Sequence, residues 1–113
     1  MNQVGARAED LCAALLRRAG LRILVRNWRC RHGEIDLIAQ DGRTLVFAEV
    51  RMRRSSAFGG AAESVTAAKR QRLIAAARLY LAGRREVACR FDVLLLDGTD
   101  GARIEWLRDA FEG

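Results

Sequence analysis

The stretch that decides the fold is residues 33–51, which read GEIDLIAQDGRTLVFAEVR. Two apolar-rich segments flank the dipeptide Asp41-Gly42, a strong signal for a two-residue turn between antiparallel strands. Such a turn places Gln40 opposite Arg43 and sets the pairing of every residue behind them. We therefore predict a β-hairpin in this part of the chain.

The predicted hairpin gathers acidic side chains on one face of its two strands. Counting back from the turn, Asp36 faces Phe47 and Glu34 faces Glu49. Because side chains alternate along a strand, the three carboxylates share a face. Directly opposite residues have Cβ atoms roughly 5 Å apart and diagonal neighbours roughly 7 to 8 Å, so Asp36 and Glu49 can reach one common point.

Carboxylates at this spacing repel one another unless one is protonated or a metal ion lies between them. A hard divalent ion fits such a site, since Mg²⁺ takes one or two carboxylates, keeps several waters and binds phosphate oxygens. We predict Mg²⁺ or Mn²⁺ as the cofactor, bound by Asp36 and Glu49. Arg51 follows on the same face with a fixed positive charge. These are the groups required to hydrolyse a phosphodiester.

A simpler interpretation is an amphipathic hairpin whose polar face meets water. The second strand argues against it, because Val46, Ala48 and Val50 line one face while Leu45 and Phe47 line the other. A strand that is apolar on both faces is typical of a buried position in a sheet. Carboxylates in such a strand need partners.

Length and composition predict a single folded domain over residues 1–113, with 50% apolar and 30% charged residues. The net charge of +6 favours nucleic acid as a partner. A preference for arginine explains part of this charge equally well, since 19 of the 20 basic residues are arginine. The predicted contacts to nucleic acid form a basic cluster of Arg51, Arg53, Arg54, Lys69, Arg70 and Arg72.

Cysteine usage and hydropathy bear on the compartment. Cys12, Cys30 and Cys89 are odd in number and form no close pair, which predicts reduced, buried thiols rather than disulfides or a zinc site. No signal peptide and no apolar run of ~18 residues is present. The sequence therefore predicts a cytoplasmic protein without a membrane partner. A monomer and a homodimer both stay open.

The apolar pattern predicts two helices and five strands in an α/β arrangement. A crossover helix between two strands implies a parallel pair, so the sheet is expected to be mixed, with an αβββαβ core. The expected elements are a helix over 4–19 that ends at Gly20, strands over 21–25, 34–40 and 44–52, a basic loop over 53–60, a helix capped by Ser64 or Thr66 and ending at Gly83, a strand over 87–96, and an edge strand around Ile104 and Trp106.

Both helices can complete the site. Helical spacing places Glu9 at the border of an apolar arc, where it can face the sheet as an auxiliary acid. An acid that merely suits the first turns of a helix is the alternative, and both interpretations stay open. On the second helix, Lys69 and Arg72 flank the apolar arc near the N-terminal end, where positive side chains suit a phosphate.

Motifs along almost the whole chain resemble the YraN family of small bacterial proteins. They are GEIDLIA over 33–39, LVFAEVR over 45–51, Arg26-Asn27, Phe58-Gly59, Lys69, Arg90-Phe91-Asp92 and Ala110-Phe111. This family is similar in turn to the restriction-endonuclease-like superfamily, and particularly to archaeal Holliday-junction resolvases. The resemblance implies a restriction-endonuclease-like fold.

The resemblance also implies roles for individual residues. Those resolvases bind metal through an Asp on one strand and Glu-x-Lys on the next, positions that Asp36 and Glu49 match here. Arg51 occupies the place of the lysine, and Glu9 best matches a glutamate on their first helix. An electrostatic role would survive the exchange of lysine for arginine, whereas a role that needs a neutral amine would not.

The sequence thus predicts a metal-dependent nuclease-like domain that acts on DNA, including branched or structured forms. The predicted catalytic set is Asp36, Glu49, Arg51, Glu34 and Glu9. Two alternatives stay open: a nucleic-acid-binding module of the same fold that does not cut, and an adaptor that uses the fold for protein interactions.

Overall fold

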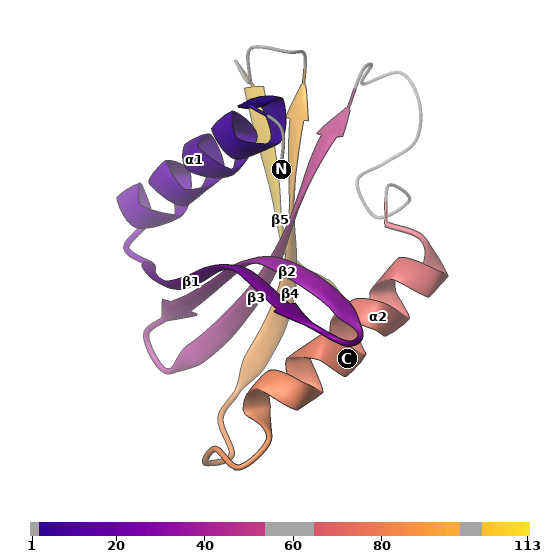
Figure 1. The fold of residues 1–113 in the computed structure, drawn as a ribbon. Coiled ribbons are helices and arrows are strands. Elements are labelled where there is room, and N and C mark those ends of the chain that lie inside the picture. Colours follow the sequence, from indigo (N-terminus) through magenta and orange to yellow (C-terminus); the bar gives the residue numbers. More distant parts are fainter. Residues whose placement is uncertain (1–2, 54–64, 98–102) are drawn as a thin grey trace.

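A computed structural model describes residues 3–53, 65–97 and 103–113 of the chain. Its elements are α1 (Gln3–Arg18), β1 (Arg22–Cys30), β2 (Gly33–Asp41), β3 (Thr44–Arg53), α2 (Ala67–Leu81), β4 (Cys89–Asp97) and β5 (Arg103–Phe111). The strands form one sheet in the order β1-β2-β3-β4-β5, in which only β3 and β4 run parallel (Figure 1). The predicted α/β class, mixed sheet and αβββαβ order are confirmed.

Element ends follow local signals. Gly20 takes a φ of +96° after α1, and Gly83 takes +77° after α2. Thr66 caps α2 by accepting a hydrogen bond from the backbone N–H of Lys69 at 3.2 Å, whereas the alternative cap, Ser64, lies outside the described residues. The prediction that β4 begins at Val87 is wrong, because the strand starts at Cys89 and Val87 is 40% exposed.

The hairpin turn lies one residue later than predicted. Asp41 pairs with Thr44, so the loop is Gly42-Arg43 rather than Asp41-Gly42. Gly42 has a φ of +60°, as the first loop position of a type II′ turn requires, and the only glycine of the turn therefore takes that position. The predicted pairing of Asp36 with Phe47 is consequently wrong.

The observed register changes which residue of β3 lies opposite Asp36. Leu37 pairs with Ala48, so the next step along both strands brings Asp36 level with Glu49. The predicted pairing of Glu34 with Glu49 is therefore also wrong.

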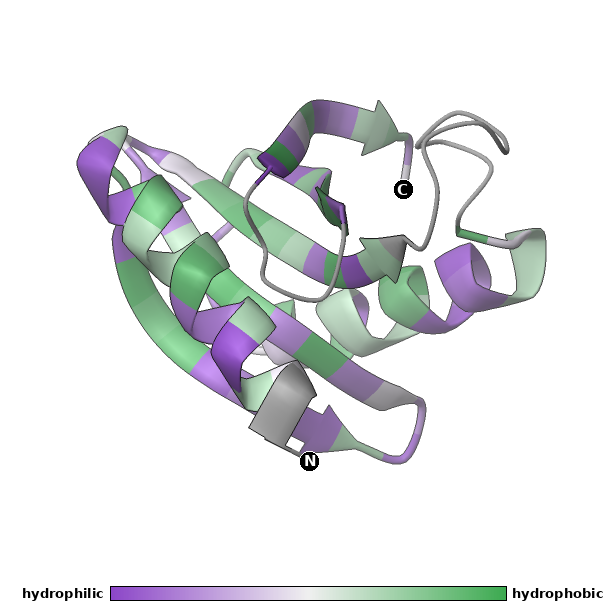
Figure 2. Ribbon diagram, turned by 90° about the horizontal axis from the view of Figure 1, so that it is seen from above, coloured by the Kyte–Doolittle hydropathy of each residue, from purple (hydrophilic) through white to green (hydrophobic). Residues whose placement is uncertain are grey.

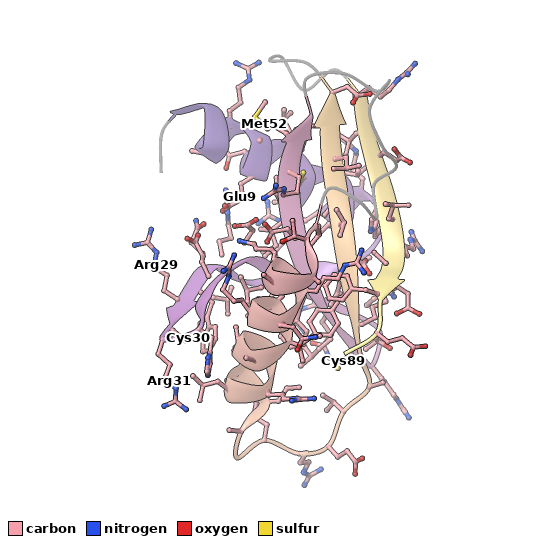
Figure 3. The ribbon with its side chains drawn as sticks, turned by 90° about the vertical axis from the view of Figure 1, so that its right-hand side faces the viewer. Glu9, Arg29, Cys30, Arg31, Met52 and Cys89 are labelled. Carbon is pink, nitrogen blue, oxygen red and sulfur yellow. The ribbon has the colours of Figure 1, made fainter. Side chains whose placement is uncertain are left out.

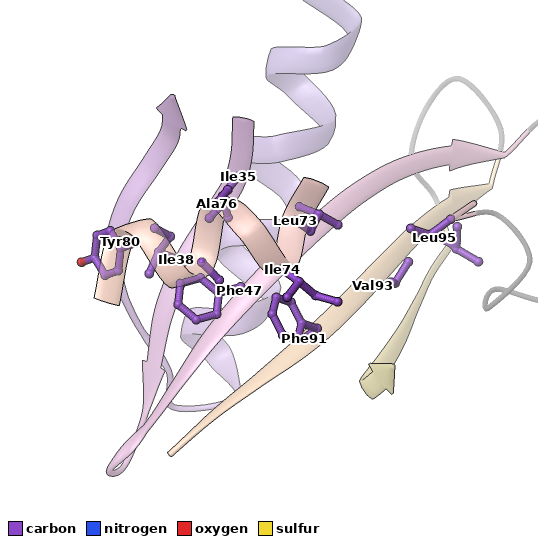
Figure 4. Packing of buried hydrophobic residues seen from close by; sticks show 12 residues of the cluster. Ile35, Ile38, Phe47, Leu73, Ile74, Ala76, Tyr80, Phe91, Val93 and Leu95 are labelled. Atoms are coloured by element: carbon purple, nitrogen blue, oxygen red, sulfur yellow. The ribbon is translucent and has the colours of Figure 1, made fainter. Parts of the chain in front are cut away.

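Two layers of apolar side chains hold the sheet, one under each helix (Figures 1 and 2). On the α2 side, aromatic rings interlock, with Phe47 and Tyr80 centroids 6.0 Å apart at 80° (Figure 4). On the α1 side, Cys12, Ala13 and Leu16 pack on the opposite face of the same strands. β3 is therefore buried on both faces, as predicted.

Side-chain alternation is interrupted beside the hairpin. Val25 and Trp28 both pack on the α2 side although they are three residues apart, and Ile35 and Ile38 across from them do the same. Asn27, with a φ of +55°, and Asp36 lie between these pairs. Strict alternation therefore does not hold for Glu34 and Asp36, and counting along β2 does not set the direction of the Asp36 side chain.

The cysteines are all free thiols, but only Cys12 is buried; Cys30 is half-buried and Cys89 is exposed, against prediction. No helix in the described ranges has the length and apolar character needed to cross a membrane.

Candidate functional site

The site forms where β2 and β3 stop pairing. The last backbone pair on this side joins Leu37 and Ala48. Beyond this pair, a side chain of β2 replaces the β2 backbone as hydrogen-bond acceptor. The backbone N–H of Val50 on β3 donates to Oδ2 of Asp36 at 2.9 Å. This contact ties the Asp36 side chain to β3 and holds it at the opening between the strands.

Glu49 lies on β3, with its side chain only 4% exposed and turned toward α2. Its Oε1 is 3.5 Å from Nζ of Lys69 and 4.0 Å from Nη1 of Arg51. Its Oε2 is buried and has no hydrogen-bond partner among the described residues. One oxygen of this carboxylate is therefore paired with cations, while the other has no donor in the part of the chain that the structure describes.

Burial and mutual repulsion disfavour charge on both carboxylates. Burial, followed by the negative charge of Asp36, raises the pKa of Glu49 to about 7, against the opposing charges of Lys69 and Arg51. Burial also raises the pKa of Asp36, although the Val50 N–H opposes the shift and the charges of Glu34 and Glu9 add to it. Both carboxyl groups therefore hold a proton more readily than they would in water.

Glu9 extends the acidic group from α1. Its side chain is 2% exposed, and its Oε1 accepts hydrogen bonds from Nε of Arg26 and Nδ2 of Asn27, both at 2.9 Å. It projects from α1, and its two hydrogen-bond donors belong to β1 (Figure 3). The structure places Glu9 facing the sheet, where helical spacing predicts it.

A small pocket lies between α1 and the two hairpin strands. Its volume is about 130 Å³, and its lining includes Ala8, Glu9, Asp36 and Val50. The carboxyl group of Asp36 is thus bordered by α1 on one side and by β3 on the other.

The remaining predicted residues divide into three groups. Glu34 pairs with Arg29 at 3.6 Å on the outer hairpin and acts on Asp36 only through its charge. Arg70 is half-buried, and its Nε donates a hydrogen bond to the carbonyl oxygen of Val65. Arg72 is exposed. Arg54 lies outside the described residues, and of Arg53 only the backbone, as the last residue of β3, is described.

Sequence reasoning missed two features of the site. Lys69 appeared as a motif of the family resemblance and as a contact to phosphate, although its ammonium lies beside Glu49. Arg26 and Asn27 appeared only as a motif, although they hold Glu9. No spacing signal could reveal these contacts, since they join residues 17 to 20 positions apart on different elements.

The donors present fit a hard divalent ion. Within the described ranges, no group of three or more His, Cys, Asp or Glu side chains is placed to hold a metal. Two carboxylates nevertheless match Mg²⁺, which takes one or two and completes its octahedron with water and phosphate oxygens. The unpartnered Oε2 of Glu49, buried and close enough to Asp36 to feel its charge, provides a lone pair for such an ion.

A second buried carboxylate shows what a fully partnered one looks like. Asp92 on β4 is 1% exposed, and it accepts hydrogen bonds from Arg90, from Nε1 of Trp106 and from the backbone N–H of Asp109. These bonds tie β4 to β5, and Arg90 extends them to Asp41 in the hairpin. Asp92 is therefore a structural group, in contrast to Glu49.

Fold and site together define a class: a small α/β protein with an αβββαβ core and a buried glutamate, Glu49, that lies near the half-buried Asp36 and is flanked by cations. The chain belongs to the uncharacterised protein family UPF0102, the YraN family, whose model matches residues 8–96. That span includes Glu9, Asp36, Glu49 and Lys69.

Similar proteins match along nearly the whole chain. A UPF0102 protein of Nitrosomonas europaea is 53% identical over 109 residues, covering 96% of this chain and 92% of that protein. One of Methylobacillus flagellatus is 50% identical over 111 residues, which is 98% of both chains. One of Dechloromonas aromatica is 52% identical over 107 residues, covering 95% of this chain and 87% of that protein.

Proposed function

We propose that this protein is a metal-dependent nuclease that binds DNA, including branched or structured forms, and hydrolyses phosphodiester bonds. The observation that carries the proposal is the Glu49 carboxylate, buried beside Asp36 with one oxygen left without a donor. A carboxylate with one buried oxygen unpaired weakens the fold unless a further cation binds that oxygen.

Each residue has a distinct role in this proposal. Asp36 and Glu49 hold Mg²⁺ or Mn²⁺, which when bound polarises a phosphate oxygen and lowers the pKa of a bound water. Arg51 supplies a fixed positive charge to the bound phosphate backbone. Glu34 and Glu9 act as auxiliary acids whose negative charge adds to the attraction for the ion.

The hydrolysis itself needs only water as co-reactant. A water oxygen bonds to phosphorus, the bond between phosphorus and one sugar oxygen breaks, and the proton lost by water ends on that sugar oxygen. The protein orients the phosphate and stabilises its charge, which is where most of the rate enhancement of phosphoryl transfer arises.

The overall charge supports nucleic acid as the substrate. With a net charge of +6, the chain attracts polyanions and releases their counterions on binding. Arg72 is exposed on α2 and is available to contact phosphates.

A cleavage assay tests the proposal directly. Linear, nicked, flapped and four-way DNA are incubated with wild-type protein and Mg²⁺ or Mn²⁺, and the products are resolved on denaturing gels. We expect wild type to cut at least one form, and Asp36→Asn and Glu49→Gln to abolish cutting. Glu86→Gln, which changes an exposed glutamate in the loop after α2, is the matched control and should cut like wild type.

A DNA-binding protein that does not cut is the second candidate, favoured by Arg51, an arginine that cannot lose its proton. If wild type binds every DNA form intact while Arg51→Lys cuts, this candidate is correct. A protein that binds no DNA or RNA at low salt would instead be an adaptor.

A further inference from the structure

Two cations approach the same oxygen of Glu49 from different elements. Lys69, on α2, is 3.5 Å from Oε1 and its side chain is 29% exposed. Arg51, on β3, is 4.0 Å from Oε1 and 42% exposed. Lys69 is therefore the closer and more enclosed of the two, although Arg51 is only two residues from Glu49 along the chain.

The start of α2 fixes the backbone of Lys69. Its N–H donates to the hydroxyl of Thr66 at 3.2 Å, and the next N–H, of Arg70, donates to the Thr66 carbonyl at 2.9 Å. The Nε of Arg70 anchors the same turn to Val65. Lys69 thus projects from a rigid first turn, where the helix dipole adds positive potential toward an anion.

The chemistry of the side chain matches the position. An ammonium has three donors on a compact head, so it can contact Glu49 and still offer donors to a second anion. A guanidinium is a larger planar fork that suits backbone phosphates in open surroundings. The chain has arginine at 19 basic positions and its single lysine here.

We propose that Lys69 is a catalytic residue: its ammonium contacts a non-bridging oxygen of the scissile phosphate, while Arg51 holds a neighbouring backbone phosphate. This inference rests on the proposed nuclease function and assigns the two cations different tasks. Lys69 contributes charge to the phosphate as the water oxygen bonds to phosphorus and the sugar oxygen leaves with the proton. It takes part in no bond change of its own.

Single-turnover cleavage separates the two tasks. Lys69→Met should lower the cleavage rate by about 100-fold or more while DNA affinity stays within about threefold, as for loss of one stabilising donor. Arg51→Met should mainly weaken DNA binding. Lys69→Arg should recover part of the rate lost in Lys69→Met. Arg85→Met, in the exposed loop at the far end of α2, controls for loss of charge alone.

A second measurement does not depend on cleavage. Lysine labelled with ¹³C at Cε gives one NMR signal, because the chain has one lysine. Mn²⁺ should broaden that signal in wild type and in Arg51→Met, and should fail to do so in Asp36→Asn. Duplex DNA added with Mg²⁺ should shift it in wild type.

The outcomes distinguish this inference from the proposed function. Cleavage by Lys69→Met within about threefold of wild type overturns the role of Lys69 and leaves the nuclease intact. If wild type cuts no DNA, the nuclease proposal fails and the NMR signal decides: a signal unmoved by Mn²⁺ and by DNA overturns the inference about Lys69. A signal that responds to both keeps Lys69 as a phosphate ligand at the metal site of a protein that only binds.

Discussion

Glu49 and Asp92 are both buried carboxylates on neighbouring strands, and their surroundings give them opposite effects on stability. Donors surround Asp92. Glu49 has cations on one oxygen only and a second carboxylate nearby. Removing the charge of Glu49 relieves a cost, whereas removing Asp92 leaves buried donors unpaired.

These surroundings predict a pH dependence for Glu49→Gln. The folded-state pKa of Glu49, about 7, is above its ordinary value of 4.5, so the folded protein retains a proton that the unfolded chain has lost. Metal-free wild type should therefore lose stability as pH rises from 4.5 to about 7, by an amount on the order of 3 kcal/mol. Glu49→Gln should be the more stable protein at pH 8 and close to wild type at pH 4.

Urea unfolding at both pH values, with chelator present, measures this difference. Glu86→Gln should match wild type throughout, while Asp92→Ala should be less stable by about 3 kcal/mol at pH 8. Adding Mg²⁺ at pH 8 should stabilise wild type and leave Glu49→Gln unchanged. Equal stability of wild type and Glu49→Gln at pH 8 would contradict the described electrostatics.

At the scale of the element, the hairpin depends on a single backbone conformation. Gly42 takes a φ of +60° at the first loop position, and a Cβ there would meet no atom within 4 Å. Any cost of a side chain at this point is therefore conformational rather than steric against the rest of the protein. The turn sets the register that brings Asp36 level with Glu49.

Gly42→Ala should consequently destabilise the protein by about 1 to 2 kcal/mol, the strain of a left-handed conformation for an L-residue. Thermal or urea unfolding measures it, and Arg43→Ala, the other loop residue, should change stability by less than about 0.5 kcal/mol. Equal effects of the two substitutions would show that the turn does not depend on Gly42.

At the scale of the whole molecule, a net charge of +6 on 113 residues predicts salt-dependent DNA binding. The logarithm of the affinity for duplex DNA should fall with the logarithm of salt concentration by about 0.9 for each phosphate neutralised. Arg72→Gln should lower this slope by about 0.9, and Arg85→Gln, at the opposite end of α2, should leave it unchanged. Gel-shift titrations from low to high salt measure both, and a slope near zero would exclude a phosphate-dominated interface.

Much of the architecture was predictable because it depends on apolar periodicity, which is local. The order of elements, the parallel pair and the burial of β3 on both faces follow from this pattern. The turn was misplaced by one residue because Asp41-Gly42 and Gly42-Arg43 are both two-residue loops that contain the glycine, and only the observed pairing of Asp41 with Thr44 distinguishes them. The break in alternation at Asn27 and the contact of Lys69 with Glu49 depend on tertiary packing, which local patterns do not encode.

The parallel pairing of β3 with β4 also orders events during synthesis. Glu49 lies level with Val93, so the strand that completes its burial leaves the ribosome more than forty residues after it. Until then its carboxylate stays hydrated, ionised at neutral pH and weakly coupled to Asp36. The nascent chain therefore carries two ordinary acids, and the buried environment of Glu49 arises only when the second half of the sheet docks.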